Sequence, residues 1–208
     1  MYEQRVDGRS NRDGDSRFPK TEAFDGKLRA LFCQLKEKEE QLEKWLTPGR
    51  QQRFMDTFWL NVALLEAEKC RGIQFYGVGC VIMSPGGVSK GHTGAMTHEH
   101  LGQTKMRHAE EVAILRAEAE GISLVGGTLY STLEPCSERL SGLRSCTSRI
   151  IGSGIKRVVF GAHEPYDPQL KITCEGAKIL AEAGIEVVHL PELQDECLAS
   201  IVSKRTKS

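Results

Sequence analysis

Segments with helical spacing of apolar residues alternate with short apolar runs from residue 51 to residue 190. Their order is one helix, two strands, and then helix and strand in turn up to the last run, GIEVVHL. The late alternation predicts right-handed crossovers and parallel strands, whereas the SPGG turn at 84–87 predicts an antiparallel hairpin. This sequence therefore predicts an α/β fold, a three-layer α/β/α sandwich with a mixed five-stranded sheet.

Two earlier segments, one helical and one without a regular pattern, come before the late alternation. Residues 52–70 predict an amphipathic helix with Phe54, Phe58, Val62 and Leu65 along one stripe. Residues 93–107 are polar and irregular, and a loop of that length inside a compact domain is usually functional or mobile.

The N-terminal part of the chain differs from the rest. Residues 1–22 lack hydrophobic periodicity and are expected to form a disordered arm. Residues 23–50 predict an added amphipathic helix, which ends at the Pro and Gly of TPGR. This helix is expected to pack on its own domain, because its apolar repeat covers under three heptads of a coiled coil. We expect one main domain at 51–192 and a C-terminal tail at 193–208.

Charge and cysteine content limit the cellular compartments and the kinds of binding partner expected for this chain. The chain has 28 Lys plus Arg and 28 Asp plus Glu, so net charge indicates neither nucleic acid nor membrane as a partner. No apolar run approaches the roughly 20 residues of a membrane span, and the N-terminus has no apolar signal-peptide centre. Seven scattered cysteines argue against a secreted disulfide scaffold. A cytoplasmic protein is expected.

Four separated residues could share one metal site. His108 and Glu110 open the helix of HAEEVAIL, and Cys136 and Cys146 flank the start of another helix. Residues two apart on a regular helix point to nearly opposite sides, so both can face one site only if His108 lies at the helix mouth. Backbone N–H groups at a helix start also favour the thiolate form of cysteine, which binds metal.

One imidazole and two thiolates form a three-ligand zinc set that leaves a fourth position for water, as in catalytic sites. Zinc lowers the pKa of such a water from ~16 to about 7. Glu110 is then available to move protons instead of binding metal. Alone, a His that opens a helix is more often a cap, and a buried Cys is more often part of the core; the combination favours zinc.

The pattern His-x-Glu, then Pro-Cys and a second Cys, resembles the zinc deaminase signature. Nine residues separate Cys136 from Cys146 instead of two, and SERLSGLRS is interpreted as a loop inserted between the ligands. Residues 53–189 resemble the deaminases of riboflavin biosynthesis in VGCVI, HAE, TLYSTLEPCS, SGLRSC and GIKRVVFGAHEP, and the insert is closer to the fungal version.

The resemblance implies a cytidine-deaminase-like fold for 51–192 and hydrolytic deamination of a ribosylamino- or ribitylamino-pyrimidine phosphate. It implies Zn²⁺ on His108, Cys136 and Cys146, with Glu110 as the residue that passes protons from water to the ring and to the leaving ammonia. It also implies a homodimer, because related pockets are usually completed by association.

Several polar residues are candidates for substrate contacts. Basic groups near the metal motif could pair with a substrate phosphate, with Arg139 in the insert as the best placed. His163 and Glu164 follow a strand end, where open α/β sheets bind ligands. The candidates are Lys105, Arg107, Arg139, His163 and Glu164.

Three other functions remain open. The first is deamination of a free base, a nucleoside or a nucleoside antibiotic, which would not require a phosphate. The second is editing of nucleic acid, which the balanced charge and the lack of interleaved aromatic and basic residues disfavour. The third is an interaction protein that uses zinc only for structure, which Glu110 argues against.

Overall fold

The computed structural model describes residues 47–70, 76–100, 102–139, 143–165 and 173–202, with nine further positions between 33 and 44. The chain divides into two compact units, residues 1–51 and 52–208. The nine positions are helical, in the segment where a helical extension is expected. The arm expected at 1–22 and the end of the tail, 203–208, lie outside the described residues.

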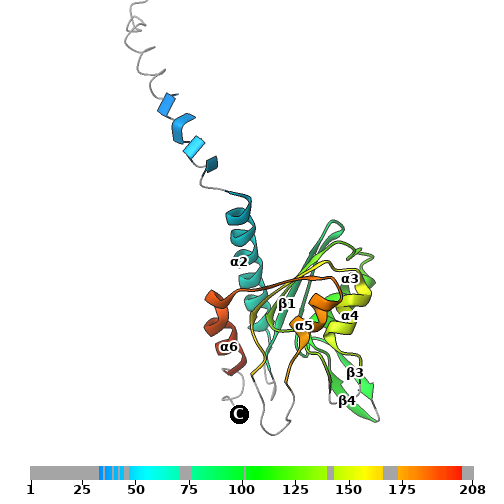
Figure 1. Cartoon of the computed structure of the whole chain (residues 1–208). Coiled ribbons are helices and arrows are strands. Elements are labelled where there is room, and N and C mark those ends of the chain that lie inside the picture. The colour runs from blue at the N-terminus through cyan, green and yellow to red at the C-terminus, as the bar shows by residue number, and fades with distance from the viewer. Residues whose placement is uncertain are drawn as a thin grey trace, which may run out of the picture. The chain divides into compact units, whose positions relative to one another are not determined.

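A mixed five-stranded sheet forms the centre of the second unit, as the sequence predicts (Figure 1). β1 pairs with β2 and with β5 in antiparallel register, and β6 pairs in parallel with β5 and with β7. The order across the sheet is β2 (Gly87–His92), β1 (Gly79–Ser84), β5 (Thr128–Leu133), β6 (Arg157–Ala162) and β7 (Glu186–His189).

Helices cover both faces of this sheet (Figure 1). One face carries α3 (Ala109–Ala119), α4 (Cys146–Ser153) and α5 (Gly176–Glu182). The other carries α2 (Pro48–Ala67) and α6 (Gln194–Val202), whose Leu60 and Cys197 both lie against Gly161 of β6. Gly91 on β2 lets α3 approach closely, because a β-carbon at position 91 would lie 2.3 Å from the Ala109 carbonyl oxygen. None of the helices in the described ranges has the length and hydropathy of a membrane span.

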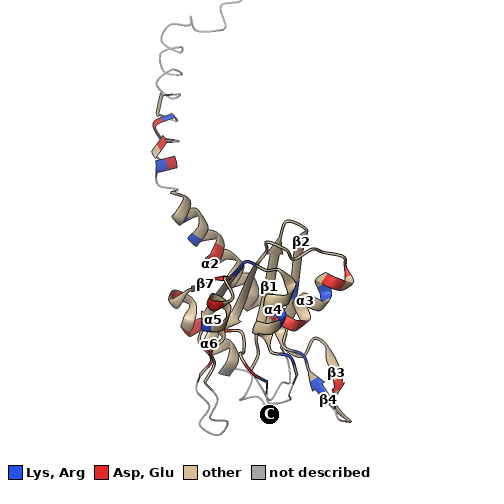
Figure 2. Ribbon diagram, turned by 45° about the vertical axis from the view of Figure 1, so that its right-hand side comes forward, with Lys and Arg blue, Asp and Glu red and all other residues tan. Residues whose placement is uncertain are grey.

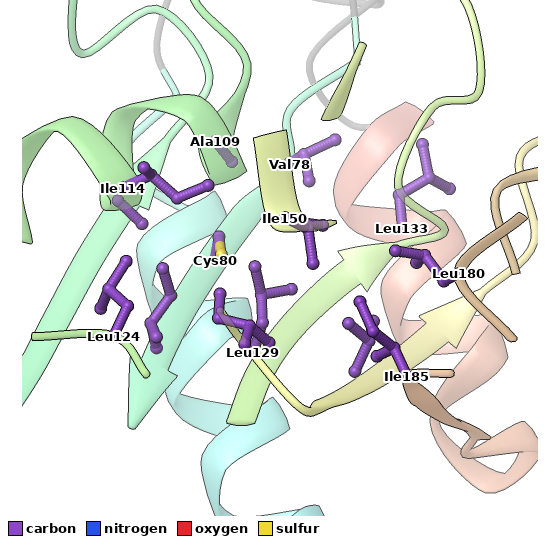
Figure 3. Packing of buried hydrophobic residues seen from close by; sticks show 14 of the residues in the cluster. Val78, Cys80, Ala109, Ile114, Leu124, Leu129, Leu133, Ile150, Leu180 and Ile185 are labelled. Atoms are coloured by element: carbon purple, nitrogen blue, oxygen red, sulfur yellow. The ribbon is translucent and has the colours of Figure 1, made fainter. Parts of the chain in front are cut away.

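Alternating strand residues supply the two cores. Cys80, Ile82, Leu129 and Val158 are fully buried in the larger cluster together with Ala113 of α3. Figure 3 shows Cys80 and Leu129 among the packed side chains of this cluster. The neighbouring positions Val81, Tyr130 and Val159 point to the opposite face and pack on Leu60 and Ala63 of α2. The three-layer prediction is therefore confirmed.

The predicted apolar stripe of α2 is wrong. Phe54, Phe58 and Leu65 are 69%, 49% and 58% exposed, and of the four predicted residues Val62 alone packs against the core. The face turned to the sheet instead contains Leu60, Ala63 and Ala67, with the buried acids Asp56 and Glu66. Apolar spacing could not reveal this face, because the two acids are buried in ion pairs: Asp56 with Arg157, and Glu66 with Lys69, three residues on, and with Lys90 of β2.

The polar stretch 93–107 is not an irregular loop. It contains a separate antiparallel hairpin of β3 (Thr97–His100) and β4 (Gln103–Met106). This two-stranded ribbon does not pair with the main sheet, so it has no need for the apolar alternation by which strands are recognised. The region expected as a C-terminal tail contains helix α6, which buries Cys197 and Ile201.

Candidate metal centre

His108 lies at the mouth of α3, where the sequence places it. It is the N-cap residue, with an extended backbone (φ −72°, ψ 157°), and the helix begins at Ala109. The preceding residue, Arg107, is fixed by backbone hydrogen bonds with Gly94 and Met96. Because His108 precedes the regular helix, its ring can face the same site as Glu110, which lies in the first helical turn.

Cys146 is the first residue of α4, and Cys136 lies three residues after β5. The hydroxyl of the N-cap residue Ser145 accepts a hydrogen bond from the Ser148 N–H at 3.3 Å. The backbone N–H of Cys146, in the first turn of the helix, donates a hydrogen bond to Cys136 Sγ at 3.4 Å. The start of α4 thus carries one thiol and directs a backbone donor at the other, which stabilises negative charge on sulfur.

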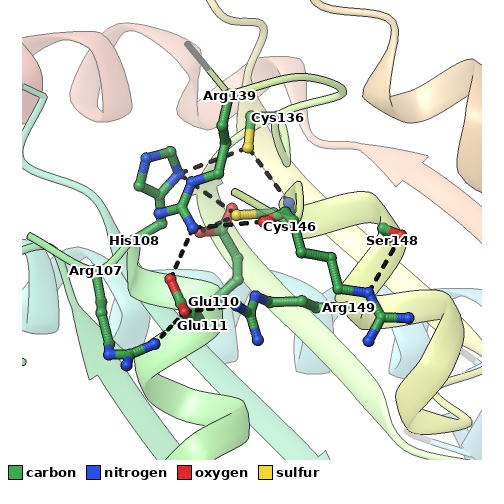
Figure 4. A network of polar contacts seen from close by, with 10 residues as sticks. Arg107, His108, Glu110, Glu111, Cys136, Arg139, Cys146, Ser148 and Arg149 are labelled. Carbon is green, nitrogen blue, oxygen red and sulfur yellow. Dashed lines mark hydrogen bonds and ion pairs between the residues drawn. The ribbon is translucent and has the colours of Figure 1, made fainter. Parts of the chain in front are cut away.

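The imidazole and the two thiols lie close together. His108 Nδ1 is 3.6 Å from Cys136 Sγ and 3.5 Å from Cys146 Sγ, and the three atoms all lie within 4.8 Å of one another (Figure 4). Tetrahedral zinc with Zn–S of about 2.3 Å and Zn–N of about 2.0 Å would place neighbouring ligand atoms about 3.5 Å apart. The three residues therefore fit a zinc ion.

The two thiols differ in their ease of ionisation. The hydrogen bond from Cys146, followed by the hydrogen bond and charge of His108, lowers the pKa of Cys136 well below its usual range. The same side-chain hydrogen bond between the two thiols, followed by burial and the negative charge of Glu110, raises the pKa of Cys146. Burial by itself would lower the pKa of His108, but its contact with Cys136 raises it overall.

Glu110 is a buried carboxyl group beside the three ligand candidates. Only 4% of the residue is exposed. Its Oε2 accepts a hydrogen bond from Cys146 Sγ at 3.4 Å, and its Oε1 accepts one from Ser131 Oγ at 3.4 Å. Burial, and then the negative charge of Cys136, raises the pKa of Glu110. Raising the pKa of a carboxyl group makes it a better proton acceptor, as a general acid–base residue requires.

Glu111, the residue after Glu110, is the centre of a cluster that the sequence analysis missed. It is fully buried, and its carboxylate contacts three arginines: Arg107, Arg139 at 2.8 Å and Arg149 at 2.8 Å. Burial would raise the pKa of Glu111, but the hydrogen bond and charge of Arg139 and the charges of the other two lower it. The second Glu of HAEE is the sequence feature that could have indicated this buried carboxylate.

A second acid, Glu134, also went unnoticed in the sequence. It is 5% exposed and lies two residues before Cys136. Its Oε2 is 2.6 Å from His163 Nδ1, and its Oε1 accepts a hydrogen bond from the Ala177 N–H of α5 at 2.8 Å. Glu134 therefore ties the end of β5 to α5 and to His163.

The structure places the five candidate substrate residues unequally. Arg107 and Arg139 reach Glu111, and His163 is joined to the site through Glu134. Burial, and then the charge of Cys136, raises the pKa of Glu164. Lys105 lies on β4 opposite His98, and among the described contacts none connects it to the three ligand candidates.

A mixed sheet that brings an imidazole and two thiolates together at helix starts, beside a buried carboxyl group, is the arrangement of zinc-dependent deaminase-like proteins. Residues 54–162 match the family described as the cytidine and deoxycytidylate deaminase zinc-binding region. The chain belongs to this family, and its cofactor is zinc.

Relatives by sequence include enzymes of riboflavin biosynthesis. The diaminohydroxyphosphoribosylamino-pyrimidine deaminase of Schizosaccharomyces pombe is 40% identical over 144 residues, which cover 67% of this chain and 33% of the relative. The riboflavin biosynthesis protein RibD of Aquifex aeolicus is 36% identical over 137 residues, 65% of this chain and 35% of the relative. The chain thus spans about one third of the length of these two relatives.

The solved structures similar to this chain include deaminases of the same kind as these sequence relatives. A diaminohydroxyphosphoribosylaminopyrimidine deaminase/reductase from Thermotoga maritima superposes with a TM-score of 0.58 at 30% identity, over 74% of this chain and 41% of that chain. The Rib2 deaminase of Aspergillus oryzae, in complex with DARIPP, has a TM-score of 0.58 at 25% identity, over 73% of this chain and 92% of that chain. The expected cytidine-deaminase-like fold is confirmed.

Proposed function

We propose that this protein is a zinc-dependent hydrolytic deaminase of a small phosphorylated aminopyrimidine, a ribosylamino- or ribitylamino-pyrimidine intermediate of riboflavin biosynthesis. The observation that carries the proposal is the placement of Glu110, buried and 3.4 Å from Cys146 Sγ, beside three residues that fit zinc. The substrate class rests on similarity to relatives named for that deamination.

His108, Cys136 and Cys146 would hold the ion, and the ion would supply a Lewis acid that makes water a nucleophile near neutral pH. The N–H of Cys146, directed at Cys136 Sγ, helps keep that sulfur in the thiolate form. Burial of both thiols excludes competing water from the sulfur atoms.

Glu110 would carry the protons. Its carboxylate accepts a proton from the attacking water and donates it to the ring nitrogen next to the amino-bearing carbon. It then takes the remaining hydroxyl proton and donates it to the amino group, which leaves as ammonia while the ring carbon keeps the oxygen. Ser131 holds Glu110 Oε1 from the side of β5, which orients the carboxyl group.

The substrate would be held by the polar residues around this centre. Three arginines surround the single charge of Glu111, so the cluster has an excess positive charge that attracts a phosphate. Arg107 and Lys105 are partly exposed and would contact the phosphate directly, while Arg139, whose side chain is 4% exposed, would act mainly through its charge. His163 and Glu164 would contact the pyrimidine edge.

The protein would act in the cytoplasm as a homodimer. Charged residues of both signs are interspersed over the described elements, which does not favour nucleic acid as a partner (Figure 2). A cytoplasmic pathway for small phosphorylated metabolites is consistent with the scattered thiols.

A second candidate function is deamination of a pyrimidine nucleotide. It is favoured by one observation: the deoxycytidylate deaminase of enterobacteria phage T2 is 38% identical over 109 residues, 52% of this chain and 50% of the relative. Both candidates use the same centre, and they differ in the group that carries the phosphate.

Ammonia release from a set of substrates tests the proposal. The set contains the diamino-phosphoribosylamino-pyrimidine, its dephosphorylated form, dCMP, cytidine and cytosine, and zinc is measured in the same preparation. Release from the first compound alone supports the riboflavin intermediate, and release from dCMP alone supports the second candidate. Release from the unphosphorylated compounds would indicate a free base or nucleoside deaminase, and zinc without any release would indicate an interaction protein.

A further inference from the structure

Each of the three proposed zinc ligands has an arginine close to it in sequence, and all three arginines contact one carboxylate. Arg107 directly precedes His108, Arg139 lies three residues after Cys136, and Arg149 lies three residues after Cys146. Their guanidinium groups converge on Glu111 from three separate segments of the chain (Figure 4).

We propose that Glu111 is a positioning residue that holds the three ligand-bearing segments in register for zinc, with Arg107, Arg139 and Arg149 as its arms. This role rests on the proposed function, because it assumes that His108, Cys136 and Cys146 bind the ion. Glu111 itself contacts neither the ion nor the substrate.

Burial makes the cluster rigid. Glu111 is fully buried and the side chain of Arg139 is 4% exposed, while Arg107 and Arg149 are 23% exposed. Charged hydrogen bonds between guanidinium and carboxylate are strong and directional, and a buried carboxylate cannot exchange its partners for water. A shift of any one arm would leave part of the Glu111 charge unpaired.

Arg139 has the most demanding position, because it comes from the insert that separates the two cysteines. Its Nη1 contacts both Glu111 Oε2 at 2.8 Å and the backbone oxygen of Arg144 at 3.4 Å. Arg144 lies at the other end of the insert, two residues before Cys146. Arg139 therefore links the two described ends of the insert to each other and to α3, close to both thiols.

The arms on the other two segments complete the arrangement. Glu111 lies on α3 and Arg149 on α4, so their ion pair joins the helix that follows His108 to the helix that begins with Cys146. Arg107 links the end of the β3–β4 hairpin to the same carboxylate. Groups that orient metal ligands from outside typically change metal affinity by 10–100-fold when they are removed.

Zinc affinity, measured by competition with a chelator, tests the role without recourse to deamination. Arg139→Gln and Arg149→Gln are expected to weaken zinc binding about 10–100-fold. The matched control is Arg157→Gln, which breaks another ion pair of a largely buried arginine, with Asp56, in a part of the fold without metal ligands. Arg157→Gln should lower the unfolding temperature of the metal-free protein and leave zinc affinity unchanged.

Glu111→Gln distinguishes positioning from a direct effect of charge on the thiolates. Glu111 and the arginines carry opposite charges, so a direct effect would change zinc affinity in opposite directions. Positioning predicts a loss in both cases, and a smaller loss in Arg139→Gln/Arg149→Gln than the product of the two single effects. Cobalt(II) absorption in the single variants should show altered intensity of the tetrahedral bands.

The results separate this inference from the proposed function. Wild-type protein without zinc affinity would overturn both. Zinc-binding wild type, with Arg139→Gln and Arg149→Gln no weaker than Arg157→Gln, would overturn the positioning role alone. If Glu111→Gln does not fold, Arg139→Lys and Arg149→Lys replace it. They keep the charge but lack the planar guanidinium group whose nitrogen contacts Glu111, and positioning requires that they bind zinc more weakly than wild type.

Discussion

Gly176, the first residue of α5, lies against the carbonyl oxygen of Pro135, so close that a β-carbon at position 176 would be 1.8 Å from that oxygen. Pro135 directly precedes Cys136. Glu134 reinforces the contact by accepting the N–H of Ala177. The position of a proposed metal ligand is thus set by a helix that supplies no ligand itself.

Gly176→Ala should therefore disturb both the fold and the metal centre. The added methyl group cannot be placed without moving Pro135, and overpacking of this kind typically costs about 1–3 kcal/mol of unfolding free energy. Denaturant unfolding and zinc competition measure the two effects. The control is Gly152→Ala in α4, where the nearest atom is the flexible end of Arg144 at 3.4 Å. Equal, small effects at both positions would contradict the packing argument.

Glu110→Gln should retain zinc and lose deamination. The amide has nearly the same shape but cannot carry a proton between water and the pyrimidine, and loss of a general acid–base group costs about 10²–10⁴-fold in rate. Steady-state ammonia release and zinc content of the same sample provide the check. Glu118→Gln, at an exposed position on the same helix, should keep the wild-type rate. A Glu110→Gln protein of normal rate would remove Glu110 from the mechanism.

The layers, the mixed five-stranded sheet and the three ligand candidates could be predicted, because they depend on local patterns, whereas the order of the strands across the sheet depends on long-range pairing. Helical and strand spacing of apolar residues is visible over ten residues, and His108 at a helix start with Pro-Cys after a strand is a sequence pattern in itself. The mouth position of His108 even follows from helix geometry, since Glu110 two residues later could not otherwise share its site.

Buried charge explains what could not be predicted. Asp56, Glu66, Glu111 and Glu134 are polar in any hydropathy pattern, yet each is at most 5% exposed. Each is buried because a partner reaches it from elsewhere in the chain, as Arg157 does over 101 residues. On α2 the same effect leaves Phe54 and Phe58 exposed, because the acids Asp56 and Glu66 are on the buried face instead.

Asp56→Ala should destabilise the protein more than removal of an exposed apolar side chain from α2. Asp56 binds Arg157 through two oxygens, at 2.6 and 2.8 Å, and receives the Tyr130 hydroxyl at 3.3 Å. Removing Asp56 leaves the largely buried Arg157 with the exposed Glu186 as its remaining acid partner. Breaking a buried ion pair costs about 3–5 kcal/mol. Chemical denaturation measures it, with Phe54→Ala as the control at an exposed position. A loss below that of Phe54→Ala would show that the pair is dispensable.

Glu66 should make stability depend on pH in the acid range. Burial alone would raise the pKa of Glu66, but the hydrogen bond and charge of Lys69, the charge of Lys90 and the contact with His92 lower it below its ordinary value of 4.5. A carboxyl group with a lowered pKa in the folded state stabilises the fold fully above its unfolded pKa. That contribution is lost as pH falls from about 4.5 through the folded pKa.

Glu66→Gln should therefore lower the unfolding temperature at pH 7 and have a smaller effect at pH 3.5 to 4, a range within about one unit below the ordinary carboxyl pKa. The measurement is thermal unfolding of both proteins across this range, with exposed Glu182→Gln as the control. A constant difference between wild type and Glu66→Gln from pH 7 to pH 3.5 would mean that the buried carboxylate gains nothing from its cationic neighbours.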